Sequence, residues 1–467
     1  MEHQGKRELK ENMPKKKSLL VAFISILVSV GGILYGYDVG VISGALLFIR
    51  DAIPMTDAEV GLIVGAVLAG GLLGTLIAGP IGDYYGRRFL IFIASIIFIL
   101  GISFILMAHH FWMLFLARLF LGVGLGVVAV AVPLYVTEIV PSEDRGKYVT
   151  FFQLLLTFGI LLAYCVDYFF AFSSNWRGMF AILLIPSLIL FVSVWILPET
   201  PRWLVANDQL EKAKRILKKL RHSDVDVAKE LGEIQISLRE IKKGSWYDLF
   251  THQLFLPSLI AIAIATFNQL TGINSFLQYA PLILKNAGIS SNAISMLGSV
   301  GIGLLNFIFT LVAMMLVDTV GRRPLLLMGV IGVVLSECYL GCVNYFFPQL
   351  SYSGMLSLIG LLFFIIFFAI GPGVVVWLAI SELFPTQIRG KGISICLFFN
   401  SLASTLLATL FLPLVKYIGI GATYWLFALF SSGYFIIVYF FLPETKAHSL
   451  EEIQHYFFQK DKTLIRQ

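Results

Sequence analysis

Charged residues are scarce in this chain. They make up 13% of its 467 residues, whereas hydrophobic residues make up 58% and the mean hydropathy is +0.87. Because about a quarter of the residues of a soluble domain are charged, this balance indicates a chain that lies largely in lipid. The net charge of +6 does not predict nucleic-acid binding, because the basic residues fall in short connections between apolar runs and form no extended basic face.

Cysteine is also rare. The four cysteines are Cys165, Cys338, Cys342 and Cys396, and all lie within apolar runs. We expect them to be buried and to act as small hydrophobic residues, so neither a disulfide framework nor a metal site is expected. The glycines of 122–126 lie inside an apolar run with no strand before them, which favours helix packing over a dinucleotide loop. No nucleophile elbow or phosphate loop is present, so we expect neither an enzyme nor a bound cofactor.

Long apolar runs are abundant. A spanning helix needs about 20 apolar residues, and Phe89–Ala108 and Gly178–Leu197 meet this length without one charged residue. Similar runs begin near residues 19, 59, 112, 149, 254, 293, 324, 354, 391 and 423. The sequence therefore predicts an all-α membrane protein with about twelve transmembrane helices, six on either side of a polar stretch.

The placement of basic residues predicts the orientation. Arginine and lysine gather in alternate connections, whereas the opposite connections carry few of them. By the positive-inside rule both termini are cytoplasmic, and the protein is a multi-pass protein of the cell inner (plasma) membrane. The predicted segments are a cytoplasmic N-terminal segment (1–18), an N-terminal six-helix bundle (19–199), a cytoplasmic amphipathic helical linker (200–250), a C-terminal six-helix bundle (251–444) and a cytoplasmic tail (445–467).

The two halves repeat three motifs in the same order. Asp83–Arg88 is matched by Asp318–Arg323, Glu138–Lys147 by Glu382–Lys391, and the Leu-Pro-Glu-Thr that contains Glu199 by the one that contains Glu444. Such repeats are typical of carriers that rock around a site at the midplane of the membrane.

These motifs carry a family resemblance. Together with Gly36-Tyr37-Asp38, Pro198–Trp203, Gln269–Asn274, Gly371-Pro372-Gly373 and Pro443–Lys446, they resemble the signature of the sugar porters of the major facilitator superfamily, over roughly residues 19–450. The resemblance implies two pseudo-symmetric six-helix bundles, a monosaccharide substrate, the proton as co-substrate and a monomeric carrier.

Two charged residues lie within apolar runs, Asp38 in the first and Arg118 in the fourth. An ionisable residue at such a depth usually marks function or a partner. The resemblance implies that Asp38 and Arg118 face each other, as they do in proton-coupled members, and that Asp38 takes up the transported proton when the arginine moves away. A static buried ion pair is the alternative.

The resemblance also implies a sugar site of amides and one indole. Its residues are Gln153, Asn268, Gln269, Asn274, Asn306, Trp377 and Asn400. Amides that join helices are the alternative for each. The chain departs from the family pattern at Ile160, where a glutamine stands in xylose symporters, and at Gln278 and Ser401, where tyrosine and tryptophan are usual.

Charged residues near the cytoplasmic helix ends form two similar groups. They are Arg87, Arg88, Glu138, Arg145 and Glu199 in the first half, and Arg322, Arg323, Glu382, Arg389 and Glu444 in the second. We expect them to pair across the two bundles and to favour the outward-open state, with the fixing of topology as the alternative. Glu337 has no counterpart in the family pattern, so a partner in a neighbouring helix, a snorkelling position and a second proton site all stay open.

The leading hypothesis is import of a hexose or pentose by proton symport. A facilitative sugar uniporter is the alternative in mechanism, and a non-transporting sugar sensor is the alternative in class.

Overall fold

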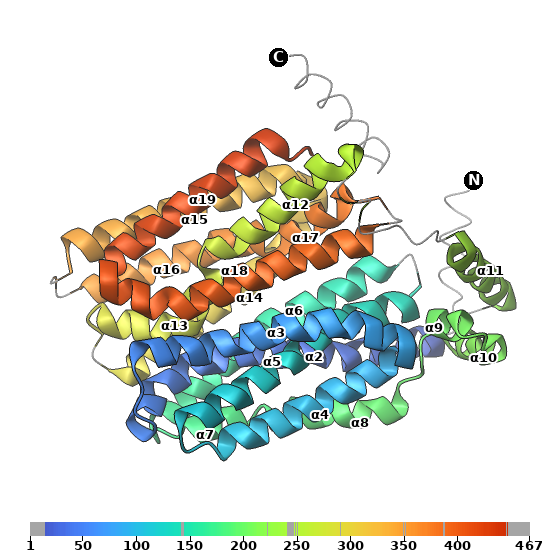
Figure 1. Cartoon of the computed structure of the whole chain (residues 1–467), viewed down its shortest axis with the longest axis horizontal. Coiled ribbons are helices and arrows are strands. Elements are labelled where there is room, and N and C mark those ends of the chain that lie inside the picture. The colour runs from blue at the N-terminus through green and yellow to red at the C-terminus, as the bar shows by residue number, and fades with distance from the viewer. Residues whose placement is uncertain are drawn as a thin grey trace.

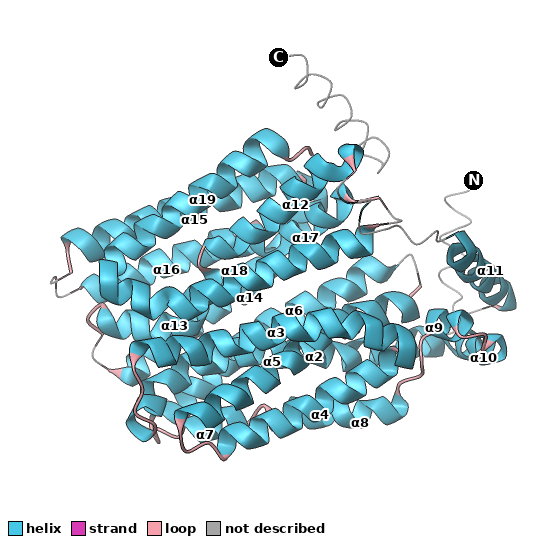
Figure 2. Ribbon diagram, in the orientation of Figure 1, coloured by secondary structure: helices cyan, strands magenta, loops and turns pink. Residues whose placement is uncertain are grey.

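The computed structural model describes residues 15–141, 144–221, 223–240, 247, 249, 251–289, 291–348, 350, 352–385, 388–444 and 446. All regular elements in these residues are helices (Figure 2). Twelve helical segments are long and apolar enough to cross a membrane, which confirms the prediction of an all-α protein with twelve spans.

The first half contributes six spans. They are α2 (Lys15–Ala52), α3 (Asp57–Tyr85), α4 (Arg87–Leu106), α5 (Phe111–Ile139), α6 (Arg145–Ala171), and the pair α7 (Trp176–Ala181) and α8 (Leu184–Ile196). Three short helices follow: α9 (Pro201–Ala206), α10 (Leu210–Leu220) and α11 (Asp224–Glu240). They lie together at one end of the bundle, which we call the linker end (Figure 1).

The second half contributes the other six spans. They are the pair α12 (His252–Leu270) and α13 (Ile273–Asn286), then α14 (Asn292–Val320), α15 (Arg322–Phe346), the pair α16 (Ser353–Ile370) and α17 (Pro372–Leu383), α18 (Arg389–Ile418) and α19 (Ile420–Phe441). The helices of each half lie side by side, with the first half below the second in Figure 1.

The seventh and tenth spans are broken for local reasons. Gly272 separates α12 from α13 with a φ of +78°, a left-handed conformation that glycine adopts without steric cost. In the tenth span Pro372 follows Gly371, and a proline has no N–H with which to continue the helix ladder. Both breaks lie at positions that the sequence analysis assigns to the family signature.

The cysteine prediction is wrong at three positions. Cys165, Cys338 and Cys342 are exposed on the outer surface of the bundle, and Cys396 alone of the four is buried. A position within an apolar run can be either buried or exposed to lipid, because a helix side that faces lipid is as apolar as one that faces neighbouring helices.

Candidate functional site

A buried ion pair joins the first and fourth spans. Arg118 on α5 donates to Asp38 on α2 over 2.6 Å, and both side chains are buried. The guanidinium also lies 5.7 Å from the ring centre of Phe180. The structure therefore brings together the two residues for which the sequence analysis predicts proton coupling.

A single hydrogen bond joins the two side chains of this pair. Asp38 Oδ2 and the Nε and Nη2 atoms of Arg118 are buried and have no hydrogen-bond partner among the described residues. A two-point arginine–carboxylate contact is the stronger and more rigid arrangement. Among the described residues, this pair has one hydrogen bond where the two-point geometry would have two.

Amide side chains meet where the seventh span breaks. Asn274 Nδ2 donates to Gln269 Oε1 over 2.9 Å, across the Thr271–Gly272 turn. Gln269 Nε2 donates in turn to Asn400 Oδ1 on α18 over 3.3 Å, and Asn400 Nδ2 donates to the carbonyl of Ala265 over 2.8 Å. Three of the predicted sugar-site residues thus form one connected network.

Ser404 extends this network and was not predicted. Its hydroxyl accepts from Asn274 Nδ2 over 2.6 Å, and the side chain is buried. Ser404 lies four residues after Asn400 on α18, so both side chains are on one side of the helix. That spacing is the sequence signal that could have identified it.

The other predicted sugar-site residues lie outside the connected amides. Asn268 is buried with its Oδ1 unpaired among the described residues, Asn306 is buried on α14, and Gln153 and Trp377 are half-buried on α6 and α17. Helix α14 packs against α6 of the other half, as shown by the 5.8 Å between the ring centres of Phe158 and Phe307. Gln153 and Asn306 thus lie on the two helices that meet at this boundary between the halves.

The two charge groups near the linker end are built alike. Glu199 accepts from the backbone N–H groups of Arg87 and Arg88, and Glu444 accepts from those of Arg322 and Arg323. The glycine before each arginine pair has a φ near +100°, and a Cβ there would lie within 2.8 Å of the glutamate. Each carboxylate therefore caps the start of a helix, where the backbone N–H groups have no partner within the helix.

These groups contain two side-chain ion pairs between described residues, and each lies within one half. Arg87 lies 3.2 Å from Glu138, and Arg322 lies 3.3 Å from Glu382. Arg389 Nε contacts the carbonyl of Phe384 over 3.4 Å, and the side chain of Arg145 lies outside the described residues. Ion pairs between the bundles, which the sequence analysis expects of the outward-open state, stay a prediction.

Two further buried carboxylates lie in the spans. Asp167 on α6 accepts from the N–H of Gly44 over 3.1 Å. Glu337 on α15 is buried, and neither of its oxygens has a hydrogen bond within 3.5 Å among the described residues, although Ser431 on α19 is near enough to interact with it. Asp167 lies four residues before the end of α6, where it packs against Gly44 of α2.

The fold and these motifs have close parallels among known proteins. The model of the family described as "Sugar (and other) transporter" matches residues 24–457. The glucose transporter GlcP of Staphylococcus epidermidis is 37% identical, with 92% of this chain and 96% of that protein covered. The galactose–proton symporter of Escherichia coli K12 is 31% identical, with 94% and 95% covered.

A solved structure agrees. The inward-open conformation of the xylose transporter XylE from Escherichia coli superposes with a TM-score of 0.81 at 29% identity, covering 93% of this chain and 99% of that one. The chain is thus a multi-pass membrane transporter with the major facilitator fold, not an enzyme, and it belongs to the sugar (and other) transporter family.

Proposed function

We propose that this transporter imports a hexose or pentose together with a proton, by alternating access of one central site. The observation that carries the proposal is the single-point Asp38–Arg118 pair, buried within the first half. Protonation of Asp38 removes the charge that holds the guanidinium. The pair then separates, and the helices α2 and α5 that carry it can change their packing.

The amides at the break of the seventh span supply the sugar contacts in this proposal. A monosaccharide presents several hydroxyl groups, each of which can donate and accept, and an amide offers both functions at once. Gln269, Asn274 and Asn400 now bond to one another, so a bound sugar would replace these bonds. Trp377 offers an aromatic ring to the apolar side of the sugar.

The coupling part of the proposal draws on similarity to proton-coupled relatives. One is described as a galactose–proton symporter, and the acid and arginine that such coupling needs are present here as a pair. We further propose that both termini and the linker end face the cytoplasm, that the carrier acts as a monomer and that it needs no cofactor besides the proton.

The test is uptake of radiolabelled hexoses and pentoses into proteoliposomes, with and without an imposed inward proton gradient. We expect the wild type to accumulate one sugar when the gradient is present, and Asp38→Asn to lose accumulation while still binding that sugar. Glu337→Gln is the matched control, because it also neutralises a buried carboxyl group but in the other half. Uptake that only equilibrates and does not depend on the gradient would indicate a uniporter. No uptake of any sugar would indicate a sensor.

A further inference from the structure

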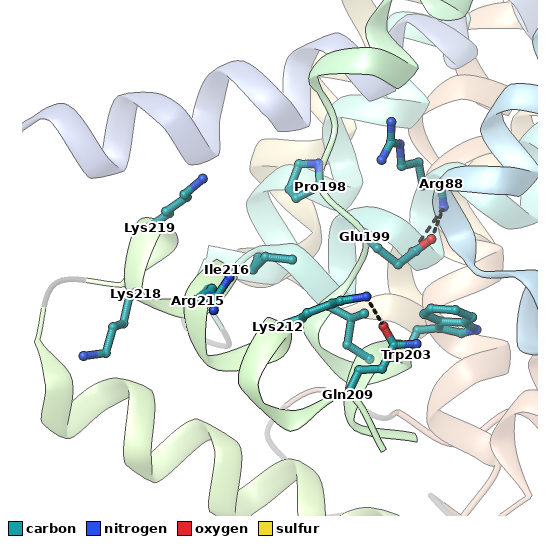
Figure 3. Close-up of a pocket in the computed structure, with 11 residues that line it drawn as sticks. Arg88, Pro198, Glu199, Trp203, Gln209, Lys212, Arg215, Ile216, Lys218 and Lys219 are labelled. Atoms are coloured by element: carbon teal, nitrogen blue, oxygen red, sulfur yellow. Dashed lines mark hydrogen bonds between the residues drawn. The ribbon is translucent and has the colours of Figure 1, made fainter. Parts of the chain in front are cut away.

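A pocket of about 650 Å³ lies at the linker end, between the first half and helix α10. Its walls come from the start of α4, the segment after α8, and helices α9 and α10 (Figure 3). The pocket is separate from the amides at the seventh span, and the function proposed above does not use it.

The pocket is strongly basic. Five of the side chains that line it are Arg88, Lys212, Arg215, Lys218 and Lys219, and Glu199 is the one acidic residue among the described residues that line it. The carboxylate of Glu199 is already occupied by backbone N–H groups of Arg88 and Thr200. Most of the positive charge is therefore not neutralised within the pocket.

The basic side chains on α10 differ in their partners. Lys218 forms an ion pair with Asp224 over 3.0 Å, and Lys212 donates to Gln209 over 2.9 Å (Figure 3). Arg215 and Lys219 form no ion pair with any described residue. Ala213, Leu217 and Leu220 turn inward from the same helix and are buried, so packing fixes the position of α10 beside the pocket.

The pocket lies at the level of a membrane surface. Tyr84 and Tyr85, just before the arginine pair that contains Arg88, are 74% and 55% exposed, and Trp195, three residues before Pro198, is 63% exposed. Exposed tyrosine and tryptophan at the ends of spanning helices mark the interface between hydrocarbon and water. Pro198, Leu204 and Ile216 add apolar surface to the same pocket. The pocket therefore suits a ligand that has both a charged group and an apolar chain.

We propose that this pocket binds a phosphate-bearing anion and that its source is the headgroup of an acidic phospholipid. Basic pockets at the ends of membrane helices favour such headgroups. A bound phosphate would contact Arg88 from the first half and Lys212 or Arg215 from α10, and would thereby hold the linker on that half. The site is independent of which sugar is carried and of proton coupling.

The test compares two double variants with the same change in net charge. Lys212→Gln/Arg215→Gln removes two basic residues of the pocket, and Lys214→Gln/Lys229→Gln removes two exposed lysines of the linker that do not line it. Purified protein is titrated with phosphatidylglycerol or with phosphatidylcholine of the same acyl chains, and bound lipid is counted by native mass spectrometry. Inorganic phosphate and glycerol 3-phosphate are added as competitors in separate arms.

We expect phosphatidylglycerol to bind the wild type and the control alike, and the pocket variant roughly 30-fold more weakly, because each basic residue near an acidic lipid contributes about fivefold in affinity. Equal binding of phosphatidylcholine, or equal losses in the two double variants, would overturn the site. Displacement by millimolar glycerol 3-phosphate would overturn the lipid as its source. If the double variant is not monodisperse, Lys219→Gln replaces it, with an expected loss of about fivefold.

Discussion

The ammonium group of Lys416 on α18 lies 3.8 Å from the carboxylate of Asp57 at the start of α3, so this ion pair joins the two halves at the end opposite the linker. Arg50 of α2 contacts the same carboxylate. Below this pair α3 and α18 approach closely, since a Cβ added at Gly61 would lie 2.1 Å from the carbonyl oxygen of Thr409. The end opposite the linker is therefore closed, in agreement with the similarity to an inward-open structure.

Asp57→Asn should loosen this closed end. The pair with Lys416 is partly exposed, so its loss should cost about 1 kcal/mol or less and shift the equilibrium towards the outward-open state by up to about fivefold. Hydrogen–deuterium exchange of residues 57–70 and 405–418 should become faster. Asp51→Asn, an exposed acid on α2, is the control, and unchanged exchange in residues 405–418 would show that the pair stabilises nothing.

The Asp38–Arg118 pair should be strongly non-additive. Removing one partner of a buried pair leaves an uncompensated charge and costs about 3–5 kcal/mol, whereas removing both charges costs much less. We expect Asp38→Asn and Arg118→Gln each to lower the thermal midpoint of the purified protein more than the double variant does. Losses that simply add up would mean that the two charges do not depend on each other.

The fold could be predicted from the sequence because each span carries its own apolar signal. Predicted starts near 59, 149 and 391 lie after the observed starts at Asp57, Arg145 and Arg389. Charged and polar residues in the first turn extend a helix beyond the hydrocarbon, where an apolar count does not detect them.

Much less of the candidate site could be predicted from local pattern. The apolar runs mark Asp38 and Arg118 as buried charges, but their pairing is implied only by the resemblance, and the packing of α2 against α5 places them 2.6 Å apart. The left-handed turn at Gly272 is local, but the close approach of Phe427, whose ring lies 2.8 Å from the position of a Cβ at Gly272, comes only from tertiary packing. The spacing of Ser404 from Asn400 marks it as a candidate, but its contact with Asn274 depends on the approach of α18 to α13.

Ser404→Ala should weaken sugar binding without abolishing it. The hydroxyl of Ser404 holds Asn274 in place over 2.6 Å, and loss of one neutral hydrogen bond costs about 1 kcal/mol, which is about fivefold in affinity. Equilibrium binding of the transported sugar measures the effect. Ser394→Ala on the same helix, whose hydroxyl bonds only to the carbonyl of Gly390 in the described structure, should bind as the wild type does; equal affinities in all three proteins would remove Ser404 from the site.

Glu199 should give the wild type a pH dependence that Glu199→Gln lacks. Burial raises the pKa of Glu199 above its ordinary value of 4.5, although the backbone N–H groups of Thr200, Arg88 and Arg87 oppose the shift. The folded chain therefore binds this proton more tightly than the unfolded chain, so the contribution of Glu199 to stability falls as the pH rises from about 4.5 through the raised pKa. The thermal midpoint of the wild type should fall relative to Glu199→Gln over that range, and the exposed Glu211→Gln should run parallel to the wild type. A difference between wild type and Glu199→Gln that does not change with pH would contradict this.

Glu337→Gln should be tolerated in both stability and transport. The side chain is buried between α15 and α19 with no cationic partner among the described residues, and a buried carboxylate without a partner is more costly than an amide of the same shape. We therefore expect an unchanged or higher thermal midpoint, together with gradient-driven uptake at the wild-type level. Glu337→Ala is the contrasting variant, because it leaves a cavity and should lower the midpoint by the equivalent of about 2 kcal/mol or more. Loss of accumulation in Glu337→Gln with normal folding would instead make Glu337 a second proton site, coupled to transport from the half of the molecule that does not contain Asp38.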